Sequence, residues 1–237
     1  DKYHLDDLLY VSSMAQMMGR LRHQCPLCLF VHGSGEQAER LLEAEGLFPD
    51  RKDGLIDVQS VREAALVERA VRQVNRRVVG RLTEEGVHAV GFQGMDRGVL
   101  RREAEGAMVA GKVDWLEALT LKRAVPVVST LLHDPAHAYA REEPLHEAVC
   151  VLGRALRHDV VVAFFTRTNQ PGVFSGEKAL RRVPLGDVPA EVMPEPEAVR
   201  AVAETGLRTV LTSAGGLFGG VERLGTNVFL SKQPKID

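Results

Sequence analysis

The stretch Leu27-Cys28-Leu29-Phe30-Val31-His32-Gly33-Ser34-Gly35-Glu36-Gln37 decides which fold we expect for this chain. Residues 27–31 are mostly apolar and predict a buried strand, and residues 37–44 have a helical pattern. Gly33 and Gly35 predict a tight turn between them, where the backbone can approach a ligand and the first helical amides favour an anion. The turn is neither a P-loop nor a complete Rossmann fingerprint. Glycines at such turns are also common for structural reasons, so both interpretations stay open.

Composition places the chain among ordinary globular proteins. Its 237 residues suffice for one large α/β domain or two small ones, with 45% hydrophobic residues, 26% charged residues and a net charge of −2. Aromatic residues are only 5%, and the near-neutral charge argues against a general nucleic-acid or membrane surface. No apolar run approaches the roughly 20 residues of a membrane span, and no signal peptide is recognisable, so we expect a cytoplasmic protein.

The cysteines and histidines do not predict a metal site. Cys25-Pro26-Leu27-Cys28 has redox or zinc spacing, but no second such pair and no histidine pair completes a ligand set. We expect a buried structural pair at the start of a strand, in a reducing compartment that also suits Cys150. Residues 133–144 carry several His, Asp and Glu side chains, but their spacing matches no ligand motif.

Hydrophobic periodicity predicts strands that alternate with helices along most of the chain. The expected helices are 5–21, 37–44, 61–82, 116–123, 144–156 and 196–206. The expected strands are 27–31, 88–92, 125–129, 159–165, 209–212 and 224–230. A hairpin or exposed loop is expected over 99–113, and polar loops over 48–54 and 133–144.

This alternation predicts a three-layer α/β/α sandwich with a mostly parallel central sheet. Ligands bind such sheets beyond the carboxyl ends of the strands. The turns that follow residues 31, 92, 129 and 165 are therefore expected to share one rim.

Several short motifs occur in the order in which one known family carries them. They are Val31-His32-Gly33-Ser34-Gly35-Glu36-Gln37 for VHGGGxQ, Asp53-Gly54-Leu55 for G-L-R-V-T, 74–79 for VNK-x-I/L-V, 89–98 for A-V/I-G-L-S-G-x-D-G-G, 125–128 for I-P-V-I, Thr166 with Pro171-Gly172-Val173 for L-T-D-V-x-G-V, and Leu224-Gly225-Thr226 for G-x-G-T. Together they make the chain similar to acetylglutamate kinases and to the related aminoadipate kinases that act on a carrier-protein-bound substrate. The resemblance covers nearly the whole chain and begins just after the family's first strand.

The resemblance implies an amino-acid-kinase fold with two lobes on one continuous sheet. Residues 1–125 would hold an N-acylated acidic amino acid or a carrier-protein-linked one, and residues 126–237 would hold ATP with Mg. The family reaction belongs to arginine- or lysine-type biosynthesis and transfers the γ-phosphoryl group in line to a side-chain carboxylate, which depends on positioning and charge neutralisation. A homo-oligomer is expected on the same grounds. By position, the phosphate would lie against Gly33, Ser34 and Gly35, the acyl substrate against Gly54, Leu55 and Gly94, and the nucleotide against Thr166, Gly172 and Val173.

The chain departs from the family pattern where the family carries charge. Ile56 replaces the arginine that would grip the substrate's α-carboxylate, and Glu195 replaces a phosphate-clamping lysine. Residues 138–147 lack the Asn and Asp of N-x-N-x-D-x-x-A, the aspartate after Thr166 has no clear match, and Lys2 is not on the K-x-G-G motif of the first strand. One lost charge contact commonly costs about 3 kcal/mol of transition-state stabilisation. We expect impaired catalysis, and the sequence indicates no catalytic residue.

Three hypotheses remain open. In the first, the chain is an active kinase in which Arg141, Arg167 or Lys178 replaces the missing lysines. In the second, it is a catalytically degenerate kinase-fold subunit that acts as an amino-acid sensor or as an oligomer partner. In the third, it is a generic α/β binding protein with structural glycine turns. The first two require residues 33–35 and 94–98 to lie over one shared cleft.

Overall fold

The computed structural model describes residues 2–21, 26–52, 54–103, 106–133, 139–157, 159–218 and 225–231. Its helices are α1 (Lys2–Leu5), α2 (Leu8–Arg20), α3 (Gln37–Ala44), α4 (Val61–Glu84), α5 (Asp114–Leu121), α6 (Leu145–Ala155), α7 (Pro196–Glu204) and α8 (Ala214–Phe218). Its strands are β1 (Phe30–His32), β2 (Arg51–Lys52), β3 (Leu55–Ile56), β4 (Ala89–Gln93), β5 (Leu100–Arg102), β6 (Met108–Ala110), β7 (Val125–Ser129), β8 (Leu131–His133), β9 (Ala140–Glu142), β10 (Val161–Phe165), β11 (Phe174–Ser175), β12 (Lys178–Ala179), β13 (Arg182–Pro184), β14 (Arg208–Thr212) and β15 (Thr226–Phe229). None of the described helices is both long enough and apolar enough to cross a membrane.

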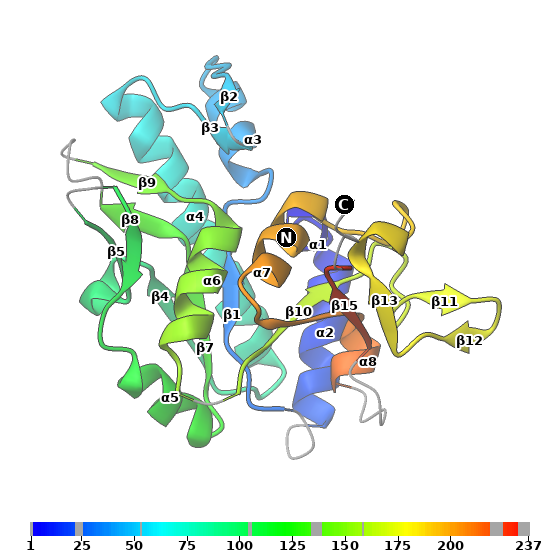
Figure 1. The fold of residues 1–237 in the computed structure, drawn as a ribbon. Coiled ribbons are helices and arrows are strands. Elements are labelled where there is room, and N and C mark those ends of the chain that lie inside the picture. Colours follow the sequence, from blue (N-terminus) through cyan, green and yellow to red (C-terminus); the bar gives the residue numbers. More distant parts are fainter. Residues whose placement is uncertain are drawn as a thin grey trace.

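The first sheet consists of three parallel strands in the order β1-β7-β4 (Figure 1). All five residues of β7 are buried, as expected for the central strand of a sheet that is covered on both faces. Val127 packs with α2, α4 and α8 on one face, whereas Val128 packs with α5 and α6 on the other. The period-2 alternation of the strand therefore supplies both apolar layers of the sandwich.

The second sheet has the order β10-β14-β15-β13 and is mixed. β10 and β14 are parallel, while β15 runs antiparallel to β14 and parallel to β13. Its core is formed by apolar side chains of β10, β14 and α7, among them Phe164, Leu211 and Val202. The helix α6 packs against both β1 and β10 and so connects the two sheets on one face (Figure 1).

The longest helix, α4, has a strong start signal in the sequence. Ser60 accepts a hydrogen bond from the backbone N–H of Glu63, and the Glu63 carboxylate accepts the N–H of Ser60, which forms a capping box. Eight residues of the helix are buried, in a stripe that faces α2, α3 and the first sheet.

The α/β sandwich with a mostly parallel sheet is confirmed, and three expectations need correction. The described strands form two larger sheets and four two-stranded sheets, where the resemblance implies one continuous sheet. β10 lies in the second sheet, so the turn after residue 165 does not follow the same sheet as the turns after residues 31, 92 and 129. The expected polar loop over 133–144 is wrong at residues 133 and 140–142, because β8 and β9 form an antiparallel hairpin, while residues 134–138 lie outside the described residues. The lobe division at residue 125 stays a prediction, although β7 pairs with strands of the expected N-terminal lobe.

Candidate functional site

The two glycine turns lie at the same edge of the first sheet. β1 and β4 flank β7 and run parallel to it, so their carboxyl ends emerge on both sides of residues 129–131. The N–H of Thr130 donates to the carbonyl of His32 (2.9 Å), and the N–H of Met95 donates to the carbonyl of Leu131 (2.9 Å). The expectation that residues 33–35 and 94–98 share one rim is therefore confirmed.

The first glycine turn connects β1 to α3. Ser34 is buried at its centre, and Gly35 has a positive φ of 61°, a conformation that favours glycine. The carbonyl of Ser34 accepts the N–H of Gln37 (3.2 Å), which closes the turn at the first residue of α3. The order of strand, turn and helix is as predicted, but the strand covers Phe30–His32 rather than residues 27–31.

Two carboxylates of the same chain occupy the amides of this turn. The N–H of Ser34 donates to Oε1 of Glu142 (2.6 Å), and the N–H of Glu36 donates to Oδ2 of Asp6 (2.8 Å). A Cβ at Gly33 would overlap Oε1 of Glu142, and a Cβ at Gly35 would lie 2.8 Å from Oδ2 of Asp6. The glycines thus give the protein's own carboxylates the close approach that an anionic ligand would need.

Burial changes the titration of Glu142. Removal of the carboxyl from water raises its pKa, and the hydrogen bonds from Ser34 and the positive charge of Arg51 offset part of this effect. The nearby negative charge of Glu39 acts in the same direction as burial. A second anion bound at this turn would lie where burial already disfavours the negative charge of Glu142.

The second glycine turn packs tightly against β7 and its continuation. A Cβ at Gly94 would lie 3.0 Å from the carbonyl oxygens of both Ser129 and Leu131, so close backbone packing explains this glycine. The turn is fixed further because the N–H of Gln93 donates to Oδ2 of Asp96 (2.8 Å) and the hydroxyl of Ser129 donates to Oε1 of Gln93 (2.7 Å).

Gly54 and Leu55 lie on the β2–β3 hairpin beside the first turn. Gly54 is exposed with a φ of 79°, and its carbonyl accepts a hydrogen bond from the Arg51 guanidinium. Arg51 also forms an ion pair with Glu39 on α3, which ties the hairpin to the helix that follows the glycine turn. Ile56 packs on the α3–α4 core, so the position expected to carry an arginine has a structural use here.

Thr166, Gly172 and Val173 lie together in the loop that follows β10. The N–H of Thr166 donates to the carbonyl of Thr212 (2.7 Å), and its hydroxyl donates to the carbonyl of Gln170 (2.6 Å). The N–H of Val173 donates to the hydroxyl of Thr226 (2.8 Å), and a Cβ at Gly172 would overlap that hydroxyl. All three positions are held by neighbouring strands of the second sheet.

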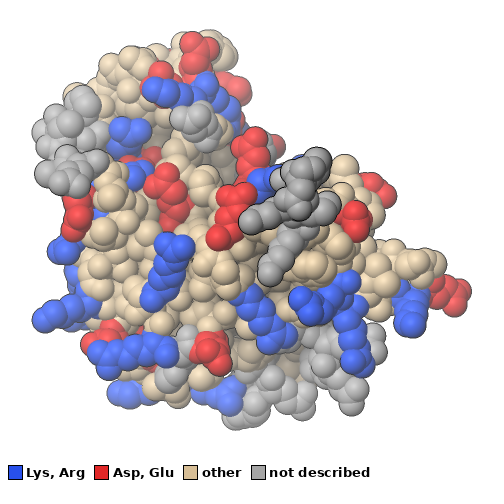
Figure 2. Space-filling model, viewed as in Figure 1, with Lys and Arg blue, Asp and Glu red and all other residues tan. Residues whose placement is uncertain are grey.

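The N-terminal residues connect this loop to the first glycine turn. Nε2 of His4 donates to the carbonyl of Thr166 (3.2 Å), while Asp6 binds the amide of Glu36. Burial is the main reason that the pKa of His4 is lowered to about 4. Figure 2 shows Asp and Glu side chains beside the hollow between the part that carries α3 and the part that carries α7.

The three candidate replacement cations do not converge on the glycine turns. Arg141 lies on β9 and Lys178 on β12, which Figure 1 shows on opposite sides of the molecule. The guanidinium of Arg167 donates to the carbonyl of Pro194 (3.2 Å) and lies over the ring of Tyr3. Within the described residues, no three His, Cys, Asp or Glu side chains are placed to hold a metal ion.

Sequence reasoning missed the roles of Asp6 and Glu142. Glu142 was visible only as part of an expected polar loop, and Asp6 only as a residue at a helix start. The only sequence signal is the presence of the two carboxylates themselves. Because residues 6 and 142 are far apart in the chain, no sequence pattern indicates that the fold brings them to one turn.

Comparisons with known proteins point in one direction. The acetylglutamate kinase of Methanopyrus kandleri is 28% identical over 222 residues, which cover 81% of this chain and 88% of the relative. The acetylglutamate kinase of Roseiflexus sp. is 26% identical over 254 residues, which cover 97% of this chain and 91% of the relative. The isopentenyl phosphate kinase of T. acidophilum superposes with a TM-score of 0.57 at 15% identity, over 93% of this chain and 90% of that protein. No family model matches the chain.

The chain has the amino-acid-kinase fold and is similar to acetylglutamate kinases. The ordered motifs of the sequence therefore belong to one architecture. Within that fold, the turn after β1 and the loop after β10 are the two segments that the N-terminal residues bridge. The carboxylates of Glu142 and Asp6 lie at the turn after β1.

Proposed function

We propose that this protein is an acetylglutamate-kinase-like protein with strongly impaired phosphoryl transfer. One observation carries the proposal: the amides of Ser34 and Glu36, in the turn expected to hold the transferring phosphate, are bound by the carboxylates of Glu142 and Asp6. A phosphate can reach these amides only by displacing both groups. Each of them would also repel it, because like charges at close range are unfavourable.

The residues present do not fit the family's nucleotide at this turn. The acetylglutamate kinases named above are kinases, which implies that they use ATP as the phosphoryl donor. In this chain, Glu195 stands where the lysine of the phosphate clamp is expected. It precedes the first residue of α7, and its negative charge raises the pKa of His4 slightly against the effect of burial. The chain therefore lacks a positive charge at the position where the resemblance expects one to hold MgATP.

The same contacts favour a binding role over a catalytic one. A degenerate subunit that senses an N-acylated or carrier-linked acidic amino acid, or that serves as an oligomer partner, needs the fold but not a charged phosphate clamp. On the β2–β3 hairpin, the exposed Lys52 offers a cationic group for such a carboxylate ligand, whereas Arg51 is already paired with Glu39.

The decisive experiment measures turnover and nucleotide binding side by side. We expect no ATP turnover above background with N-acetylglutamate, and weak MgATP binding by calorimetry. Replacing both carboxylates with alanine (Asp6→Ala with Glu142→Ala) should tighten the binding of inorganic phosphate or MgATP at least tenfold, because two amides are released and two negative charges are removed.

Glu177→Ala is the matched control, because this exposed glutamate lies between β11 and β12, far from the turn. It should leave phosphate binding unchanged. Turnover by the unmodified chain at rates typical of kinases would refute the proposal. A folded double variant that binds phosphate no better would also count against it, because the carboxylates would then not be what excludes the anion.

A further inference from the structure

Glu142, whose carboxylate binds the first glycine turn, is followed by a second glutamate that faces another part of the molecule. Successive side chains of an extended segment point to opposite sides. Arg141 is exposed, and its Nε lies 3.7 Å from Oε1 of Glu143, so these two side chains share one side of β9. Glu142 points to the other side, toward the amide of Ser34.

Glu143 is fixed through both its backbone and its side chain. Its N–H donates to the carbonyl of Thr130 (3.1 Å), and the N–H of Thr130 donates to the carbonyl of His32 at the end of β1 (2.9 Å). The side chain of Glu143 is buried, and its carboxylate forms an ion pair with the guanidinium of Arg102 on β5. The residue after Glu142 is therefore held at two points.

Arg102 joins three segments of the chain. Besides Glu143, its guanidinium donates to the carbonyl of Gly106 (2.7 Å) and lies 3.0 Å from Oε2 of Glu147 in the first turn of α6. The hydrogen bond to Glu143 is the main reason that the pKa of Arg102 is raised. Because Glu143 is buried and Glu147 is partly exposed, solvent screens the contact with Glu143 less.

The position of Glu142 requires support of this kind. Burial disfavours its negative charge, so the carboxylate would be better solvated outside the turn. The amide of Ser34 holds one of its oxygens (2.6 Å). Because the next residue is tied to Thr130 and to Arg102, the backbone at Glu142 cannot rotate freely to carry the carboxylate into water.

We propose that Arg102 is a positioning residue for the carboxylate in the first glycine turn: its ion pair with Glu143 holds the neighbouring Glu142 on the amide of Ser34. The inference rests on the proposed function in one respect, namely that Glu142 excludes anions from the turn. It adds that this exclusion depends on an arginine of a different hairpin. The β5–β6 hairpin is thereby coupled to the glycine turn through β9.

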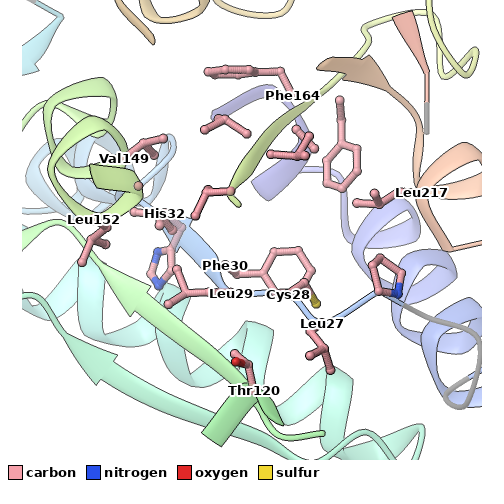
Figure 3. A pocket seen from close by; sticks show the side chains of 18 of the residues that line it. Leu27, Cys28, Leu29, Phe30, His32, Thr120, Val149, Leu152, Phe164 and Leu217 are labelled. Atoms are coloured by element: carbon pink, nitrogen blue, oxygen red, sulfur yellow. The ribbon is translucent and has the colours of Figure 1, made fainter. Parts of the chain in front are cut away.

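The helix α6 offers a control for general loosening around Arg102. Its first turn carries Glu147, whereas Val149 and Leu152 line a largely apolar cavity of about 560 Å³ between the two larger sheets (Figure 3). Val149→Ala changes the packing of α6 on its cavity side and keeps all three charged partners.

The test follows the amide of Ser34 by nuclear magnetic resonance and hydrogen exchange in the full chain. In the unmodified protein its proton shift should change with pH as Glu142 titrates, because this carboxylate is its acceptor. Arg102→Ala should remove most of that change and speed exchange of the Ser34 amide roughly tenfold, which corresponds to the loss of one hydrogen bond to a charged group. Arg102→Lys should restore most of the pH-dependent shift, because an ammonium can still pair with Glu143.

Two matched variants should leave the Ser34 amide unchanged. They are Arg101→Ala, at the exposed neighbouring position of β5, and Val149→Ala. If Arg102→Ala does not fold, Glu143→Gln replaces it, because it keeps the shape of the side chain and removes the charge that pairs with Arg102. An unchanged Ser34 amide in the folded variant would overturn the proposal, as would an equal change in either control.

Binding of inorganic phosphate, measured by calorimetry, separates this inference from the proposed function. Arg102→Ala should bind phosphate more tightly than the unmodified chain but less tightly than the double carboxylate variant, because Asp6 still occupies the amide of Glu36. A released Ser34 amide without any gain in phosphate binding would refute the exclusion of anions by Glu142, and with it the proposed function. A Ser34 amide that stays bound in Arg102→Ala would refute the positioning role alone.

Discussion

Nδ2 of Asn75 lies 2.9 Å from Nε2 of His32. Because an amide nitrogen only donates, Nε2 is the acceptor, and the ring proton resides on Nδ1, which donates to the carbonyl of Gly33 (2.8 Å). The second hydrogen of the Asn75 amide is used by the carbonyl of Val127 (2.9 Å). One buried side chain of α4 thus joins β1 and β7 at the point where the first glycine turn begins.

Asn75→Ala should destabilise the protein by about 2–4 kcal/mol, because it leaves the buried Nε2 of His32 without this donor and removes the hydrogen bond to the carbonyl of Val127. The free energy of unfolding in urea measures this. Arg76→Ala, at the exposed neighbouring position of the same helix, should change it by less than about 0.5 kcal/mol. A loss of equal size in both variants would indicate a general effect on α4 rather than the loss of these bonds.

Stability should rise with pH between about 4 and 6.5 because of His32. Burial lowers the pKa of this ring to about 4, so the unfolded chain binds more protons than the folded one in this window. The contribution is present above the ordinary pKa of 6.5 and is lost, on the order of 3 kcal/mol, as the pH falls to the folded value. Urea unfolding at a series of pH values measures the slope.

His32→Gln should reduce that slope, and His4, which is also buried with its pKa lowered to about 4, should account for part of the remainder. His88→Gln is the control, because this histidine is exposed. An unchanged slope in a folded His32→Gln variant would contradict the assignment.

Glu142 should have the opposite effect on stability. Burial raises its pKa, so the folded chain holds the proton to higher pH than the unfolded chain, and stability falls as the pH rises above the ordinary carboxyl value. Glu142→Gln keeps an acceptor for the Ser34 amide and removes the buried charge. We expect the variant to unfold at a higher urea concentration at pH 7, and Glu177→Gln to leave the midpoint unchanged. A lower midpoint for Glu142→Gln would show that the charge itself stabilises the turn.

Gly172→Ala should cost at least about 2 kcal/mol. The position has a φ of 121°, and the new Cβ would overlap the hydroxyl of Thr226, which also accepts the amide of Val173. Gly176→Ala is the matched control: its φ is also positive, at 59°, but nothing lies within 4 Å of the added carbon. It should cost roughly 1 kcal/mol from backbone strain alone. Thermal or urea unfolding distinguishes the two costs, and equal losses would show that the overlap is relieved.

The sequence predicts most elements because their signals are local. The apolar runs at 125–129 and 159–165 indicate strands, of which β7 is fully buried whereas β10 is buried only at Phe164. The Ser60–Glu63 capping box and the apolar stripe that follows it define α4. The sequence does not predict the hairpin of β8 and β9, because its second strand contains Arg141 and Glu142, charged residues that are typical of a polar loop. Glu142 is nevertheless half-buried, and its carboxylate accepts the amide of Ser34 in the glycine turn, a tertiary effect that no local pattern shows.

The sequence predicts where the candidate site lies, but not that carboxylates of the same chain bind its amides. Parallel strand order follows from alternating helices and strands, and it brings Gly33 and Gly94 to one edge. The carboxylates that close the first turn come from residues 6 and 142, which are not neighbours in any sequence pattern. The Cys25–Cys28 pair stays a prediction, since Cys25 lies outside the described residues, and Cys28 lines the cavity between the sheets.

The open edges of β1 and β10 also have a practical consequence for handling the protein. An unpaired strand edge is a template for any extended chain, including one from a partly unfolded neighbour. Concentrated preparations should therefore become turbid on warming, and dilution should delay this. Light scattering during a temperature ramp at two protein concentrations would measure the effect before any structural work.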